Sequence, residues 1–152
     1  MRVAEQAAAV LSNAIVFEQT QEESLIDPLT GLPNRRLLAS RLGSELARAE
    51  RMHGNLAVLV LDVDGFKQIN DTHGHAVGDE VLRQIAVTLG RALRAYDLCV
   101  RFAGDEFVVL LGDCPPDIVE EKRQELQHLI EEIGVKADGL VVPVGAKIGR
   151  AH

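Results

Sequence analysis

LAVLVLD, residues 56–62, is the stretch of sequence that decides the fold. Six apolar residues follow one another without a polar interruption and lead directly into Asp62. An uninterrupted apolar run of this length is typical of a strand buried on both faces, so we expect it to occupy the middle of a sheet. Such a strand carries the carboxylate of Asp62 at its C-terminal end.

Hydrophobic periodicity predicts helices and short strands on both sides of this central run. In chain order we expect a helix over residues 35–53, the strand 56–62, a helix over 79–94, strands over 100–102 and 107–111, a helix over 115–133 and a strand over 140–148. The sequence AGDE, residues 103–106, separates the two short strands and predicts a hairpin with an acidic tip. Residues 62–71 are expected to form a loop, and Asn34 is a candidate helix cap.

The first 26 residues are interpreted as a separate linker helix. Small and apolar side chains recur there at alternating steps of four and three residues, at Val3, Ala7, Val10, Ala14 and Phe17. This spacing resembles a coiled-coil seam and favours a dimer-forming helix, although a surface helix packed on its own domain stays open, because few heptads are present. A turn-rich patch then starts the second unit, residues 27–152.

The composition narrows the classes of function. A formal net charge of −7 with dispersed basic residues argues against a nucleic-acid-binding protein, because phosphate neutralisation needs a basic face. No apolar stretch reaches the roughly 18 to 20 residues of a membrane span, and we expect a cytoplasmic domain. Cys99 and Cys114 lack the spacing of metal ligands and suit a reducing compartment. An anionic ligand therefore needs a local device, such as a metal ion or a phosphate-cradling loop.

Three carboxylates form the candidate site. Asp62 ends the central strand, and Asp105 and Glu106 lie at the hairpin tip, so neighbouring strands of one sheet bring them together. Converging acids need a counterion, and Mg²⁺ prefers oxygen ligands and substrate phosphates. Two such ions would clamp the attacking and leaving oxygens of a phosphoryl displacement. The alternative is that the two hairpin acids are ordinary solvated turn residues.

The stretch after the central strand admits a second interpretation, as an EF-hand calcium loop, which its spacing rejects. With Asp62 as the first position, glycine falls at the fourth instead of the sixth, and His73 stands where the twelfth-position glutamate is needed. A loop that directs Lys67 toward phosphates and Asn70 toward a base fits better. His73 and His75 have no cysteine or third histidine beside them, which favours structural roles.

Three motifs in order resemble the GGDEF family of diguanylate cyclases: DPLTGLPNRR at 27–36, DVDGFKQINDTHGHAVGD at 62–79 and RFAGDEF at 101–107. The resemblance extends over residues 27–149. It implies an α+β fold, with a palm-like, ferredoxin-type central sheet flanked by helices. It also implies condensation of two GTP molecules into cyclic di-GMP with release of pyrophosphate, by two domains that face each other in a homodimer. The first segment is similar to the C-terminal helix of a GAF sensor domain, which implies an upstream sensor domain.

The resemblance also implies roles for individual residues. It places Mg²⁺, with Mn²⁺ as an alternative, on Asp62, the backbone of Val63, Asp105 and Glu106. It makes Asp105, Glu106 and Lys67 the catalytic group, with Lys67 at the triphosphate. It assigns substrate binding to Asn70, Asp79, Phe66 and Gly104, the first two reading guanine. A carboxylate accepts from both N1–H and the exocyclic amine of guanine, whereas adenine offers no such donor pair.

RAYD, residues 94–97, matches the RxxD form of the family's product-inhibition site. The resemblance implies that Arg94 and Asp97 bind cyclic di-GMP as an allosteric inhibitor, since an arginine fork suits guanine and phosphate. The alternative is an ordinary arginine and aspartate at the end of a helix.

The sequence departs from the family pattern at three places. Ala103 replaces the first signature glycine, Lys147 stands where a small hydroxyl residue is common, and no terminal helix of the AMYxAKxxGRN kind follows the last strand. We therefore expect a C-terminally shortened domain. Two functions remain open, an active cyclase or a catalytically impaired module that binds GTP or cyclic di-GMP and relays a signal through dimerisation. Another palm-like nucleotidyl transferase is a third, which Asn70 and Asp79 disfavour.

Overall fold

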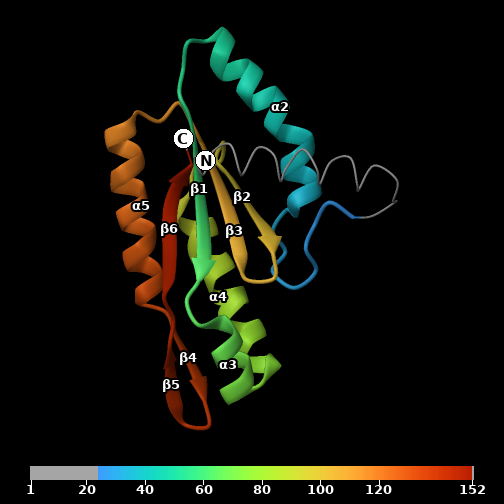
Figure 1. The fold of residues 1–152 in the computed structure, drawn as a ribbon, viewed down its shortest axis with the longest axis vertical. Helices are drawn as coiled ribbons and strands as arrows, with labels where there is room; N and C mark the ends of the chain where they lie inside the picture. The colour runs from blue at the N-terminus through green and yellow to red at the C-terminus, as the bar shows by residue number, and fades with distance from the viewer. Residues whose placement is uncertain (1–23, 152) are drawn as a thin grey trace.

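The computed structural model describes residues 24–151 and shows an antiparallel sheet with helices on both faces (Figure 1). The elements are α2 (Arg35–Arg51), β1 (Leu56–Val63), α3 (Phe66–His73), α4 (His75–Ala92), β2 (Leu98–Ala103), β3 (Glu106–Gly112), α5 (Pro116–Glu131), β4 (Gly134–Ala137), β5 (Leu140–Pro143) and β6 (Ala146–Ala151). The main sheet has the order β2-β3-β1-β6, and all neighbours are antiparallel. This is the strand order of a ferredoxin-type sheet, so the predicted α+β class is confirmed.

The apolar run of residues 56–61 forms the centre of this sheet, as predicted. β1 pairs with β3 from Leu56 opposite Gly112 to Asp62 opposite Glu106, and with β6 on its other side. Five consecutive residues of β3, 107–111, are buried, as expected for a strand covered on both faces.

Two hydrophobic cores cover the two faces. The larger one joins β1 and β3 to α4 and α5, with Leu59, Leu61, Leu82 and Phe107 at most 1% exposed. The smaller one lies beneath α2 and consists of Leu38, Val100, Val108 and Leu110. Asn34 caps α2 as expected, because its side chain accepts hydrogen bonds from the backbone N–H groups of Arg36 and Leu37.

The predicted loop over residues 62–71 is wrong in its second half, where the chain forms helix α3. Gly65, with φ of 59°, turns the chain from β1 into this helix, and Ile69 is buried beneath it. Gly74, with φ of 93°, then separates α3 from α4, which begins at His75 and not near residue 79. The error arose because α3 has only eight residues, too few for a clear helical repeat.

The predicted last strand, residues 140–148, is also wrong, because it divides between two sheets. Its first half is β5, which pairs with β4 in a separate hairpin, and its second half is β6 of the main sheet. Asp138 and Gly139, with φ of 50° and 79°, form the turn of that hairpin. An Asp-Gly pair between two apolar runs is typical of a hairpin turn, so this pair predicts a strand on either side of it, and β4 is the first of the two.

The predicted linker helix lies outside the described residues. Among residues 24–151, no helix is long and apolar enough to cross a membrane.

Candidate functional site

The strand register places the carboxylates of Asp62 and Glu106 side by side. Directly opposed residues in antiparallel strands point to the same face of the sheet. Asp62 lies opposite Glu106 of β3 and also opposite Lys147 of β6, while Glu106 lies opposite Ala103 of β2. We call these four residues the strand-end row. The row crosses the whole sheet at the end where β1 leads into α3 (Figure 1).

Asp105 joins this acidic centre through the backbone. The N–H of Val63 donates a hydrogen bond of 3.1 Å to the carbonyl oxygen of Asp105, which fastens the hairpin tip to the end of β1. Burial raises the pKa of Glu106, and the nearby charges of Asp62 and Asp105 raise it further. The three acids therefore lie near one another at this end of the sheet.

The three carboxylates fit a divalent cation by their chemistry. They offer hard oxygen ligands, and a cation would neutralise the negative charge that Asp62, Asp105 and Glu106 bring to this end of the sheet. Within the described part of the chain, no three acidic, histidine or cysteine side chains already form a metal-binding group. His73 and His75 flank Gly74 at helix ends, consistent with structural roles.

Helices α3 and α4 position the residues expected to contact a base. Asn70 packs against Gly78 so closely that a Cβ atom at Gly78 would lie 1.8 Å from Asn70 Oδ1, and Phe66 lines the same contact. Asn70 Oδ1 is buried, and no group among residues 24–151 donates a hydrogen bond to it. Asp79 follows Gly78 directly and is half-buried, and Lys67 is exposed in the first turn of α3.

The turn of residues 103–106 between β2 and β3, which we call the signature turn, is held by a contact that the sequence pattern did not predict. Arg101 donates hydrogen bonds of 3.3 and 2.9 Å to the carbonyl oxygen of Gly104, and its other nitrogen pairs with Asp27 at 3.1 Å. Burial raises the pKa of Asp27, but hydrogen bonds from Thr30 and Arg101 outweigh it and hold the pKa below its usual value. Asp27, in the turn-rich patch that begins the domain, thus stabilises the signature turn through Arg101, which lies 74 positions further along the chain.

Ala103 does not strain the signature turn. It ends β2 opposite Glu106, and among the described residues the non-glycine positions with positive φ are His53, Asp113 and Asp138. A Cβ at Gly104 would meet no atom within 4 Å, so only a bound ligand would restrict that position. The methyl group of Ala103 is therefore compatible with the turn as it stands.

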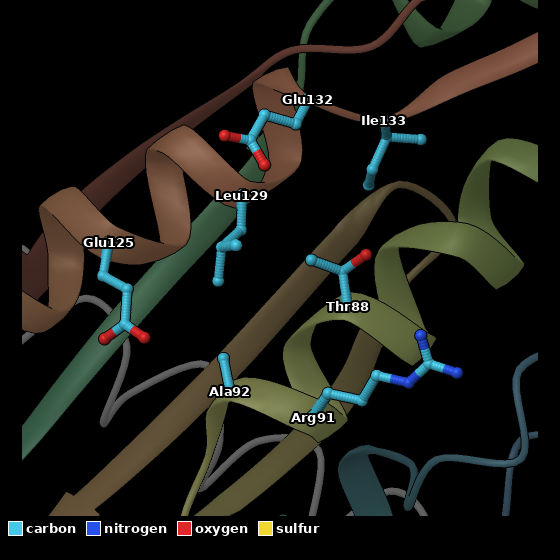
Figure 2. Close-up of a pocket in the computed structure, with 7 residues that line it drawn as sticks. All are labelled: Thr88, Arg91, Ala92, Glu125, Leu129, Glu132 and Ile133. Carbon is cyan, nitrogen blue, oxygen red and sulfur yellow. The ribbon is translucent and has the colours of Figure 1, made fainter.

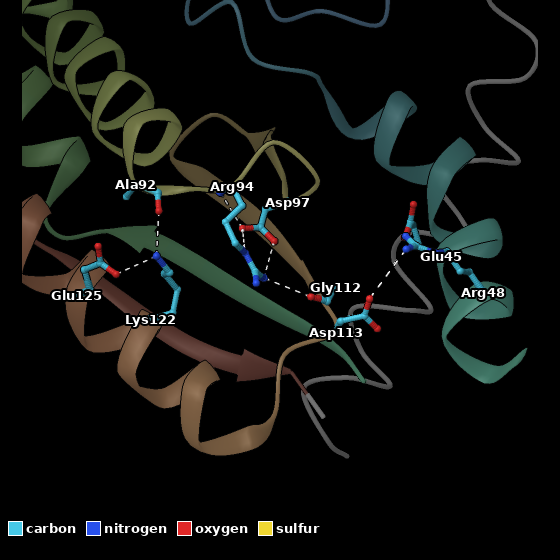
Figure 3. A network of polar contacts seen from close by, with 9 residues as sticks. All are labelled: Glu45, Arg48, Ala92, Arg94, Asp97, Gly112, Asp113, Lys122 and Glu125. Carbon is cyan, nitrogen blue, oxygen red and sulfur yellow. Dashed lines mark hydrogen bonds and ion pairs between the residues drawn. The ribbon is translucent and has the colours of Figure 1, made fainter. Parts of the chain in front are cut away.

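Arg94 and Asp97 form a pair at the opposite end of the sheet (Figure 3). Arg94 Nε and Nη2 donate to the two carboxylate oxygens of Asp97 at 3.1 and 3.0 Å, and Nη2 also donates to the carbonyl of Gly112 at 3.2 Å. The hydrogen bond with Asp97 raises the pKa of Arg94. The guanidinium lies 4.4 Å from the ring centre of Tyr96. β3 separates this pair from the strand-end row by roughly 20 Å, at about 3.3 Å per residue.

A cavity of about 410 Å³ lies between α4 and α5 (Figure 2). It is lined by Thr88, Arg91, Ala92, Glu125, Leu129, Glu132 and Ile133. Lys122 beside it donates to the carbonyl of Ala92 at 2.9 Å and pairs with Glu125 at 2.8 Å (Figure 3). None of the residues expected at the candidate site lines this cavity.

Together, the ferredoxin-type sheet and the carboxylates at the end of its central strands define an α+β domain with an acidic strand-end site. The family described as diguanylate cyclase, GGDEF domain, matches residues 24–152. The chain therefore belongs to the GGDEF family of diguanylate cyclases.

Relatives and solved structures agree with this assignment. The diguanylate cyclase DgcP of Pseudomonas aeruginosa is 50% identical over 113 residues, which are 74% of this chain and 16% of that protein. The response regulator PleD of Caulobacter vibrioides is 45% identical over 64% of this chain and 21% of its own length. The chain thus spans a small part of these relatives.

Two crystal structures have the same fold. The diguanylate cyclase SiaD of Pseudomonas aeruginosa, solved with its activator SiaC, has a TM-score of 0.80 at 36% identity, over 96% of this chain and 58% of that one. The GGDEF domain of DgcB from Caulobacter crescentus, solved with c-di-GMP, has a TM-score of 0.80 at 27% identity, over 86% and 78%.

Proposed function

We propose that this domain condenses two GTP molecules into cyclic di-GMP. In each half of the reaction, the 3′-oxygen of one GTP forms a bond to the α-phosphorus of the other. The bond from that phosphorus to the bridging oxygen breaks, and pyrophosphate leaves. The observation that carries this proposal is the register pair of Asp62 and Glu106, with Asp105 fastened beside them.

Asp62, the backbone of Val63, Asp105 and Glu106 are the proposed ligands of Mg²⁺, with Mn²⁺ as an alternative. When bound, the metal would neutralise phosphate charge and polarise the reacting oxygens. A Glu106 carboxylate oxygen is the proposed acceptor of the proton from the attacking 3′-hydroxyl, because the strand register places this carboxylate beside Asp62 at the proposed reaction centre. Lys67 would contact the triphosphate, and Gly104 leaves room for it to approach.

The guanine preference is assigned to Asn70 and Asp79. Asn70 is held against Gly78, and one end of its amide is buried, which directs the other end outward. Asp79 follows on the first turn of α4 and offers two acceptor oxygens. Phe66 packs beside them as part of the same substrate-binding group.

We propose the assembly of the domain, its regulation and the location of the reaction from its membership of the same family. Each domain holds one GTP, so the active form is a homodimer with two facing sites. The Arg94–Asp97 pair is the proposed site where cyclic di-GMP inhibits the enzyme. An upstream sensor domain would control the dimer, and the reaction would take place in the cytoplasm. No nucleic acid is needed as a partner.

The function is tested by incubating the protein with GTP and Mg²⁺ and measuring cyclic di-GMP and pyrophosphate. Wild type should form one cyclic di-GMP and two pyrophosphates from two GTP, and Asp105→Ala should form neither. Glu80→Ala is the matched control, because this half-exposed acid on α4 pairs, among residues 24–151, only with Arg83 and Gln84 of its own helix. A wild-type protein without product refutes the cyclase.

The pre-formed Arg94–Asp97 pair supports a second candidate, a receptor for cyclic di-GMP. An inactive wild type that still binds cyclic di-GMP, with binding lost in Arg94→Ala, would identify this function.

A further inference from the structure

Lys147 lies in the strand-end row beside the acid that the proposed reaction uses. Asp62 has Glu106 opposite it on one side and Lys147 on the other. Opposed residues of this kind have Cβ atoms about 4.5 to 5.5 Å apart and share a face of the sheet. The row therefore carries two carboxylates and, at its β6 end, one ammonium group.

The neighbours of Lys147 fix its direction. Ala146 and Ile148 on either side are 2% and 8% exposed and face the core with α5, so Lys147 points to the other face. Gly149, two residues on, places no side chain on that face, and Asp62 and Lys147 are both exposed. Among residues 24–151, no ion pair holds the Lys147 ammonium.

We infer that Lys147 is a further substrate-binding residue, whose ammonium binds a phosphate of the nucleotide beside Asp62. This inference rests on the proposed function. Phosphates and carboxylates repel one another, so a nucleotide that lies over Asp62 and Glu106 requires positive charge nearby. An ammonium on a flexible four-carbon stem is a compact point charge that binds phosphate without fixed geometry.

A second consequence follows from the same geometry. Lys147 lies opposite Asp62, where a divalent cation is proposed to bind, and two cations close to one carboxylate repel each other. Lys147 thus strengthens nucleotide binding while it weakens the binding of a metal ion without nucleotide. A merely structural lysine on an exposed strand would change neither affinity.

The test measures binding instead of turnover. The probe is α,β-methylene GTP, which cannot release pyrophosphate. It is titrated into four proteins, once in the presence of Mg²⁺ and once in the presence of EDTA. The proteins are wild type, Lys147→Ser, Lys147→Arg and Lys136→Ser. Lys136 is the matched control, because it is an exposed strand lysine on β4, outside the row. Mn²⁺ binding without nucleotide is measured on the same proteins by electron paramagnetic resonance.

Lys147→Ser should weaken binding of the probe by about tenfold or more, as for a lost charge-assisted hydrogen bond. Lys147→Arg and Lys136→Ser should stay near wild type, and Lys147→Ser should bind Mn²⁺ more tightly. Circular dichroism confirms that each variant is folded. If Lys147→Ser binds the probe as wild type does, the inference is overturned and the proposed function stands. If wild type does not bind the probe, both fail.

Discussion

Gly78→Ala separates the role of Asn70 in nucleotide binding from its role in the fold. The new Cβ would lie 1.8 Å from Asn70 Oδ1 and 2.9 Å from its Cγ. Neither distance is tolerable, so the Asn70 side chain must rotate out of its place. The backbone of α4 has no reason to move, because Gly78 lies within a regular helix and the obstructing atoms belong to one side chain.

The expected magnitudes differ for stability and binding. Overpacking costs roughly 1 to 3 kcal/mol, while replacing an interior helix glycine by alanine gains about 1 kcal/mol, so the net loss of stability is about 0 to 2 kcal/mol. Losing the Asn70 contact to guanine costs about 1 to 3 kcal/mol of binding, or roughly 5- to 150-fold in affinity for the GTP analogue.

Gly90→Ala is the matched control, because Gly90 lies in the same helix and a Cβ there meets nothing within 4 Å. It should raise the free energy of unfolding by roughly 0.5 to 1 kcal/mol and leave binding unchanged. Calorimetry of the analogue and urea unfolding measure the two quantities. A Gly78→Ala protein that binds the analogue like wild type would refute the assignment of Asn70 to guanine.

Three further predictions concern the rest of the domain. Asp27→Asn should destabilise the fold by about 1 to 3 kcal/mol near neutral pH, because it breaks a largely buried pair with Arg101. The folded pKa of Asp27 is lowered, so its stabilisation is present above the usual value of 3.8 and is lost as the pH falls further. Urea unfolding should therefore show a smaller difference between the proteins at pH 2.5 than at pH 7. Leu82→Ala should cost about 2 to 5 kcal/mol, because Leu82 is 1% exposed, and a smaller loss would contradict its place in the core. Arg94→Ala should abolish binding of cyclic di-GMP and leave binding of the GTP analogue unchanged, and equal loss of both would contradict two separate sites.

The central strand and the acidic hairpin could be predicted because their signals are local. The six apolar residues before Asp62 are stable only when they are buried, so they predict a central strand. The AGDE turn separates two short apolar runs, so it predicts a hairpin. The division of residues 140–148 between two sheets could not be predicted from the apolar pattern. That pattern shows which residues are buried, but it does not show which strand they pair with. Val142 and Ile148 are both buried, but Val142 belongs to the β4–β5 hairpin and Ile148 to the main sheet.

The candidate site was predicted in the same uneven way. Its acids are candidates that the sequence itself offers, whereas the contact that supports the signature turn could not be predicted, because Asp27 and Arg101 are 74 positions apart. The sequence offers Asn70 as a candidate for base binding, but it does not show that the position of this side chain depends on Gly78. That contact exists only when α3 folds against α4.

The sequence by itself determined the family, the central strand and the identity of the carboxylates, because each is carried by residues close together in the chain. Only the tertiary structure decided the register, which places Glu106 and Lys147 on either side of Asp62. Register depends on how strands far apart in sequence align their buried faces, and a shift by one residue would turn these side chains to the other face. That alignment turns separate charged residues into one site.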